Sequence, residues 1–103
     1  MIDVTDKVYK ITALIPKGKV LTYSSLANLS EVKSPRVVGS ILHKNPDPTK
    51  IPCHRVVSQK GLVAKKFAFG GAEKQIERLR SEDVEVVDGK VNLSNHFWQP
   101  ERT

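Results

Sequence analysis

The apolar positions of the N-terminal stretch recur at helical spacing. Val4, Val8, Ile11 and Ile15 are separated by four, three and four residues, so they share one face of an amphipathic helix. The tripeptide Pro16-Lys17-Gly18 then interrupts the pattern, because proline and glycine are poorly tolerated inside a helix. We therefore predict a first helix that ends at this tripeptide.

Two further short helices are predicted, each beginning at a capping side chain. Thr22 or Ser24 can cap the second, and Ser34 can cap the third, which has a proline at its first position and runs to about Lys44. The residues expected to face inward are Leu26, Ala27 and Leu29 in the second helix and Val37, Val38, Ile41 and Leu42 in the third. Three short helices with tight connections are typical of a helix-turn-helix unit, here at about residues 20–44.

The second half of the chain alternates between short extended segments and one helix. Residues 51–57 are apolar and are predicted to be extended, and a helix is expected from about Ala72 to Glu82. Residues 64–71 are expected to form a loop able to move. Asp88-Gly89 is a strong signal for a two-residue hairpin. Ile76 and Leu79 are expected to be buried on the helix, and Phe97 and Trp98 to pack back onto the domain. Val84, Val86 and Val87 alternate partly with Glu85 before the hairpin turn, and Val91 and Leu93 lie on the return strand.

Charge is distributed unevenly along the chain. The sequence has 17 Lys and Arg against 11 Asp and Glu, for a net charge of +6. Residues 1–70 carry a balance of +8, whereas residues 71–103 carry −2. A basic excess confined to the first two thirds favours a polyanionic partner, most often nucleic acid. The alternative is a basic protein whose charge serves only solubility.

Length and composition exclude several classes of protein. A chain of 103 residues suits one domain, which we predict to span residues 1–103. No apolar run approaches the roughly 18–20 residues of a membrane span, and no signal peptide is visible. The single cysteine excludes a disulfide scaffold. We expect an intracellular monomer, in the cytoplasm of a prokaryote or the nucleus of a eukaryote, without a membrane contact.

Cys53 is followed directly by His54 and Arg55, which suggests a nucleophilic thiolate, because positive neighbours favour the charged form of sulfur. The alternatives are a buried structural thiol and a surface histidine. Adjacent residues of a strand point to opposite faces, so Cys53 and His54 can share a proton only if Pro52 bends the backbone or a water bridges them. Glu82 is a sensible carboxylate to orient His54. The cysteine and histidines lack the spacing of a metal site.

The segment Ile51-Pro52-Cys53-His54-Arg55-Val56-Val57 resembles the active-site motif of the O6-alkylguanine-DNA alkyltransferases. Other landmarks of that family stand in order around it: Ile15 to Val20, Thr22-Tyr23, Pro35 to Gly39, Asn45-Pro46, Gly70-Gly71 and the helix ending at Glu82. The resemblance implies an α/β fold, a winged helix-turn-helix-like DNA-binding alkyltransferase domain with a small C-terminal hairpin.

The resemblance also implies a role for each matching residue. Cys53 would accept the alkyl group, His54 would act as its base through a water, Glu82 would orient His54, and Asn45 would hold the turn before the motif. Arg36 would fill the gap left by the flipped base, and Tyr23 would press on the neighbouring phosphate. Further DNA contacts are expected from Thr22, Ser34, Ser40, Lys44 and Arg55, and the alkyl pocket from Pro52 with Phe67 or Phe69. The partner would be double-stranded DNA containing O6-alkylguanine, with no cofactor and no metal.

Some features depart from the alkyltransferase pattern. The short chain and its ending, from Val91 to Pro100, resemble the alkyltransferase-like proteins, which bind alkylated DNA without transferring the group and flag it for nucleotide excision repair. Those proteins typically carry Trp at the position of Cys53. Asp83 stands where a Gly is usual. Three hypotheses follow: an irreversible single-turnover alkyl acceptor, a non-transferring damage sensor that recruits repair proteins, and a plain DNA-binding regulator.

Overall fold

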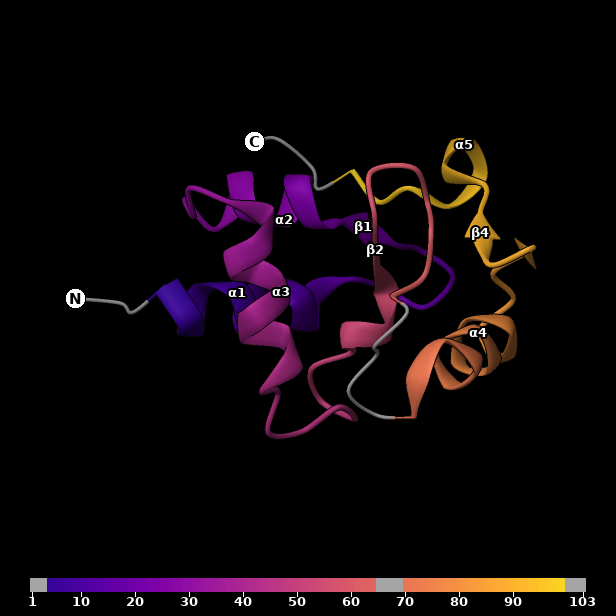
Figure 1. The fold of residues 1–103 in the computed structure, drawn as a ribbon, viewed down its shortest axis with the longest axis horizontal. Helices are drawn as coiled ribbons and strands as arrows, with labels where there is room; N and C mark the ends of the chain where they lie inside the picture. The colour runs from indigo at the N-terminus through magenta and orange to yellow at the C-terminus, as the bar shows by residue number, and fades with distance from the viewer. Residues whose placement is uncertain (1–3, 65–69, 100–103) are drawn as a thin grey trace.

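The fold is described for residues 4–64 and 70–99 of a computed structural model. Helices and short strands alternate along the chain (Figure 1). In order they are α1 (Val4–Leu14), β1 (Leu21–Thr22), α2 (Tyr23–Leu29), α3 (Pro35–His43), a 3-10 turn (Cys53–Arg55), β2 (Val56–Val57), α4 (Gly71–Ser81), β3 (Val86–Val87), β4 (Lys90–Val91) and α5 (Leu93–His96). The α/β class and the helix-turn-helix expected from the sequence are confirmed.

The helices α2 and α3 begin where capping side chains were predicted. The Thr22 hydroxyl accepts a hydrogen bond from the Ser25 N–H at 3.1 Å, and the Ser34 hydroxyl accepts one from the Arg36 N–H at 3.1 Å. Each bond satisfies one of the free N–H groups at a helix start. Two inward predictions were wrong, because Leu29 is 42% exposed at the end of α2 and Val37 is 43% exposed on α3. This helix is only nine residues long, so its buried stripe reduces to Val38 and Leu42.

The strand β1 pairs in parallel with β2, with Leu21 opposite Val56 and Thr22 opposite Val57. This pairing brings the 51–57 segment against the helix-turn-helix, in the centre of Figure 1. The prediction of a continuous extended segment was wrong for its middle, because residues 53–55 form a 3-10 turn. The Arg55 N–H bonds the Pro52 carbonyl at 2.9 Å to close that turn.

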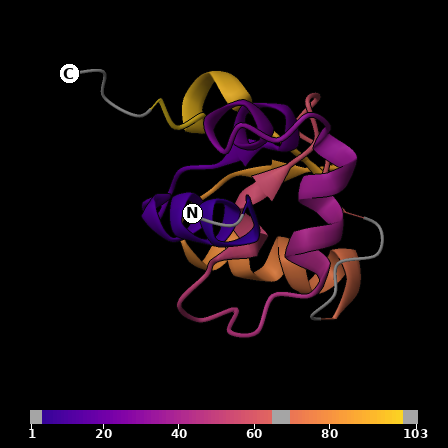
Figure 2. The ribbon, with the colours of Figure 1, turned by 90° about the vertical axis from the view of Figure 1, so that its left-hand side faces the viewer.

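The two paired strands lie between two separate hydrophobic clusters. Leu21 and Val56 belong to the cluster formed with α1, α2 and α3, whereas Val20 and Val57 belong to the cluster formed with α4 and the hairpin. Successive strand residues point to opposite sides, so each strand contributes to both. Viewed from the side of the three helices, α1 stands in front of the strand pair with α3 to one side (Figure 2). Cys53 lies in the first cluster.

The C-terminal part forms the predicted hairpin and returns to the domain. Val86 pairs with Val91 across the Asp88-Gly89 turn, and both turn residues have positive φ, as a type I′ turn requires. Leu93 was predicted on the return strand but begins α5 instead, because the Asn92 side chain accepts from the Ser94 N–H at 3.0 Å and caps that helix. The Trp98 N–H bonds the Val20 carbonyl at 2.8 Å, so the tail packs back as expected.

Two residues after the end of α4, Asp83 adopts a backbone conformation that favours glycine. Asp83 has φ +65°, and its N–H bonds the Arg80 carbonyl at 3.1 Å while the Val84 N–H bonds the Leu79 carbonyl at 3.0 Å. This pair of bonds defines a Schellman terminus, whose left-handed residue is usually glycine. The glycine that the alkyltransferase resemblance implies at this position would have a conformational reason.

Replacing Asp83 by glycine is expected to raise the free energy of unfolding by about 0.5–1 kcal/mol, because the left-handed conformation no longer strains a Cβ. Urea denaturation of the two proteins measures this difference. The matched control is Glu73→Gly, also on α4 and exposed, which should lower it by about 0.5–1 kcal/mol because φ is ordinary there. A destabilised Asp83→Gly variant would contradict this account of the helix end.

Candidate active site

Cys53 is the first residue of the 3-10 turn, and only 5% of it is exposed. Burial raises the pKa of the Cys53 thiol, and the opposing effects of the Asn45 side chain, the Arg78 charge and the backbone N–H do not cancel it. The sulfur is therefore a protonated thiol at neutral pH. Because the thiolate is the nucleophilic form, any reaction at Cys53 needs a nearby base.

His54, the next residue along the chain, carries a neutral base. Burial lowers the pKa of His54, and the attraction of Glu82 recovers only part of the loss. The imidazole is thus uncharged at neutral pH. Its Nε2 lies 3.0 Å from Glu82 Oε1. The carboxylate does not lie along the ring N–H direction, so the pair is an electrostatic contact and not a well-aligned hydrogen bond. Within the described residues, Nδ1 has no hydrogen-bond partner, so it is free to take part in proton transfer.

Glu82 is held in place by Arg55 as well as facing His54. The Arg55 Nε donates to Glu82 Oε1 at 2.8 Å, its Nη2 donates to Oε2, and its Nη1 donates to the Ile15 carbonyl at 2.6 Å. Burial alone would raise the pKa of Glu82, but the Arg55 hydrogen bonds and His54 outweigh it, and the pKa lies below its usual range. The carboxylate is therefore ionised and fixed opposite the imidazole.

This arrangement corrects the prediction that Arg55 contacts DNA. Its side chain is 12% exposed, and its donors bind Glu82 and the Ile15 carbonyl inside the fold. A two-pronged arginine–carboxylate pair is among the strongest charge-assisted interactions, so these donors are not available to a phosphate. Arg55 instead anchors the carboxylate that faces His54.

Asn45 lies where the sequence placed it, between α3 and the active-site segment. Its Nδ2 donates to the Ile51 carbonyl at 2.7 Å, and its Oδ1 accepts from the Asp47 N–H at 2.9 Å. The residue is 6% exposed, so these bonds are buried and hard to replace with water. The Asn45 side chain thereby fixes the turn that presents Cys53.

Sequence reasoning missed Gln75, which is fully buried on α4. Its amide Nε2 donates to the carbonyls of His54 and Val56, at 3.1 and 3.0 Å, and its Oε1 accepts from the Ala64 N–H at 2.7 Å. Only its place in the helical repeat gave a signal, since Gln75 precedes Leu79 by four residues and Glu82 by seven on the same face. Because most residues of α4 are polar, this position did not distinguish Gln75 from the exposed polar residues of the helix.

The predicted DNA contacts divide into exposed and occupied residues. Arg36, Ser40 and Lys44 are exposed along α3, so their side chains are accessible to a partner. The Ser34 hydroxyl is engaged as the helix cap. Thr22 is 5% exposed and its hydroxyl caps α2, so its side chain does not offer the DNA contact expected from the sequence.

Of the residues predicted around the reacting group, Tyr23 and Pro52 lie in the described part of the chain. Tyr23 is partly buried and packs on the cluster that contains Cys53. Burial raises the pKa of its phenol, and the nearby Cys53 raises it further. Pro52 is buried directly before Cys53. Phe67 and Phe69, the two candidates for the alkyl pocket wall, and most of the expected mobile loop lie outside the described residues.

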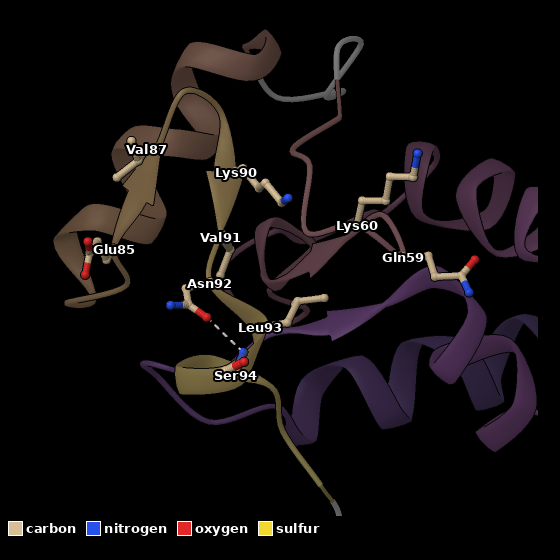
Figure 3. Close-up of a pocket in the computed structure, with 9 residues that line it drawn as sticks. All are labelled: Gln59, Lys60, Glu85, Val87, Lys90, Val91, Asn92, Leu93 and Ser94. Atoms are coloured by element: carbon tan, nitrogen blue, oxygen red, sulfur yellow. Dashed lines mark hydrogen bonds between the residues drawn. The ribbon is translucent and has the colours of Figure 1, made fainter.

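A separate groove lies between the hairpin and the turn after β2 (Figure 3). Lys90 extends from β4 toward the segment that carries Gln59 and Lys60. The nine residues lining the groove include none of those predicted for catalysis or DNA binding. Among the described residues there is no group of three potential metal ligands, and no helix long and apolar enough to cross a bilayer.

The family model of the 6-O-methylguanine DNA methyltransferase DNA-binding domain matches residues 3–84. The chain belongs to this family. Its membership confirms the resemblance drawn from the Pro-Cys-His-Arg segment and the landmarks around it. Both methyltransferases and alkyltransferase-like proteins are found among the chain's relatives.

Relatives from both branches are similar to this methyltransferase-family chain. Alkyltransferase-like protein 1 of Schizosaccharomyces pombe is 36% identical over 91% of this chain and 93% of its own length. The crystal structure of that protein with damaged DNA containing O6-carboxymethylguanine has a TM-score of 0.84 and 32% identity, over 94% of this chain and 95% of the other. The methylated-DNA–protein-cysteine methyltransferase of Methanocaldococcus jannaschii is 39% identical over 87% of this chain. The match covers 52% of the length of that methyltransferase.

Proposed function

We propose that this protein repairs alkylated DNA by transferring the alkyl group of O6-alkylguanine to Cys53, through one domain spanning residues 1–103. The Cys53 sulfur attacks the alkyl carbon, forming an S–C bond as the bond from carbon to guanine O6 breaks. His54 takes the thiol proton, and guanine leaves with the electron pair and regains a proton. The thioether is stable, so each molecule acts once.

The observation that carries this proposal is the order of groups from thiol to carboxylate. Cys53 is a protonated nucleophile, His54 is a neutral base in the next position, and the ionised Glu82 faces the imidazole at 3.0 Å. The positive charge that develops on His54 as it takes the proton is stabilised by that carboxylate. A buried structural cysteine needs none of these groups.

The surface beside the site supports a DNA partner. The exposed helix α3 presents Arg36 at its start, with Lys44 directly after its end, within the stretch of the chain that carries the basic excess. A guanine inside the base stack is out of reach of a buried sulfur, so the nucleotide must be flipped out. Arg36 is proposed to occupy the gap in the duplex, and Tyr23 to contact the neighbouring phosphate.

The proposal is tested by incubating the protein with duplex DNA containing O6-methylguanine and weighing the intact protein and its peptides. We expect the mass of one methyl group on the peptide that contains Cys53, and none after DNA with unmodified guanine. Cys53→Ala serves as the control and should gain nothing. A wild-type protein that binds the damaged duplex but gains no mass would contradict the proposal.

A second candidate is a damage sensor that holds alkylated DNA for nucleotide excision repair proteins. The observation that favours it is the structural match over this chain: the S. pombe alkyltransferase-like structure matches 94% of it with a TM-score of 0.84, whereas methyltransferase structures match 80–85% of it with TM-scores of 0.66–0.72. For a sensor, Cys53→Ala binds O6-methylguanine DNA as tightly as wild type and Arg36→Ala binds it more weakly, without any mass gain. Equal affinity for damaged and undamaged duplexes would instead indicate a plain DNA-binding regulator.

A further inference from the structure

The fully buried side chain of Gln75 joins three segments of the active site. One amide nitrogen donates to the carbonyls of His54 and Val56, and the amide oxygen accepts from the Ala64 N–H. The two carbonyls lie at the 3-10 turn and at the start of β2, and Ala64 follows the turn that comes after β2. A single side chain on α4 therefore fixes both ends of residues 54–64.

The same helix also holds the ring of His54. Glu82 follows the end of α4 and faces His54 Nε2 at 3.0 Å, while Gln75 binds the His54 carbonyl at 3.1 Å. The helix thus contacts His54 at its backbone and at its side chain. Two contacts from one rigid element fix where the imidazole lies relative to the neighbouring Cys53, which a single contact cannot do.

We propose that Gln75 is a positioning residue for alkyl transfer: it acts through the backbone of the 3-10 turn to keep the Cys53 sulfur and the His54 imidazole in reacting geometry. The proposal rests on the proposed function, and it goes beyond it by assigning a role to a residue that hydrogen-bonds the backbone of the active-site segment. Displacements of about 1 Å in such supporting contacts can cost on the order of 100-fold in rate.

The geometry also distinguishes this role from ordinary stabilisation. Loss of the Gln75 amide removes one hydrogen bond from each of two carbonyls and one from the Ala64 N–H, which destabilises any fold. A residue that only stabilised the fold would change the melting temperature and leave the folded protein's chemistry as it was. A positioning residue changes the rate in the folded protein.

The test compares Gln75→Met, which keeps the length and apolar volume but removes all three hydrogen bonds, with Thr12→Val. Thr12 is also fully buried, and its hydroxyl donates to the Val8 carbonyl within α1 at 2.6 Å, so its loss matches the removal of a buried hydrogen bond elsewhere. Single-turnover transfer from O6-methylguanine DNA is measured at increasing DNA concentration. This separates the affinity for DNA from the rate constant at saturation.

We expect Gln75→Met to slow the saturating rate by tenfold or more, with the DNA dissociation constant within twofold of wild type. Thr12→Val should leave both unchanged in the folded protein. Gln75→Asn, which keeps the amide on a side chain one methylene shorter, is expected to give an intermediate rate, and it decides the question if Gln75→Met does not fold. A saturating rate equal to wild type in the folded Gln75 variants would overturn the positioning role.

A second readout does not depend on DNA. The rate at which iodoacetamide alkylates Cys53 is measured against pH in wild type and in each variant. Gln75→Met or Gln75→Asn should shift the midpoint of this profile, because the backbone that carries Cys53 and His54 is no longer held as before. An unshifted midpoint would overturn the positioning role. Absence of methyl transfer in the wild-type protein would overturn the proposed function alone, since the iodoacetamide profile is read without it.

Discussion

Replacing Glu82 by glutamine is expected to slow methyl transfer by about 100-fold or more, because the neutral amide no longer stabilises the charge that forms on His54. The same change is expected to lower the free energy of unfolding by about 3 kcal/mol, because it leaves the buried guanidinium of Arg55 without its carboxylate. Single-turnover transfer and urea denaturation measure the two effects. Both follow from the single carboxylate shared by His54 and Arg55.

The matched control for this prediction is Glu73→Gln. Glu73 lies on the same helix but is exposed, so its neutralisation should leave the rate unchanged and the stability within about 0.5 kcal/mol. Transfer is measured at a temperature at which circular dichroism shows each variant to be folded. A Glu82→Gln rate within threefold of wild type would show that the carboxylate does not assist His54.

Replacing Gly61 by alanine is expected to lower the free energy of unfolding by about 2–4 kcal/mol. Gly61 has φ +86°, and a Cβ at this position would lie 2.4 Å from the Val91 carbonyl oxygen. The Gly61 carbonyl also accepts from the Val91 N–H at 2.8 Å, so the two backbones cannot separate without losing that bond. The contact joins the turn after β2 to the hairpin, and its loss should loosen both.

Gly71→Ala separates the clash from the backbone conformation. Gly71 has a similar φ of +78°, but a Cβ there meets nothing within 4 Å. Its replacement should cost only about 1 kcal/mol, the usual penalty of the left-handed region. Thermal unfolding of the two variants side by side measures the difference, and equal losses would mean that the approach of Gly61 to Val91 is not the cause.

Much of the fold was predictable because local signals agreed with the tertiary structure. The capping hydroxyls of Thr22 and Ser34 marked the starts of two helices, and Asp88-Gly89 marked the hairpin. Each signal acts within a few residues of the chain, where sequence determines conformation most directly. The approach of Glu82 to His54, 28 positions away, had no local signal: Glu82 was chosen as a sensible carboxylate for this role, and the family resemblance implied the same contact.

The failures share a different cause, since each depended on a distant partner. Arg55 stands in a basic stretch, which favoured a DNA contact, but its side chain is buried in an ion pair with Glu82 at the end of α4. The apolar 51–57 segment suggests a strand, yet pairing with β1 begins only at Val56. Gln75 looks like an ordinary polar helix residue until the backbone carbonyls that it binds are placed around it.

The most direct measurement of the central claim is the mass of Cys53 after reaction with duplex DNA containing O6-methylguanine. We predict one added methyl group on the Cys53 peptide, in a quantity that never exceeds one per protein molecule, and restoration of guanine in the DNA. An unmodified Cys53, recovered from a protein that is folded and bound to the damaged duplex, would contradict alkyl transfer and leave the damage sensor as the account of this protein.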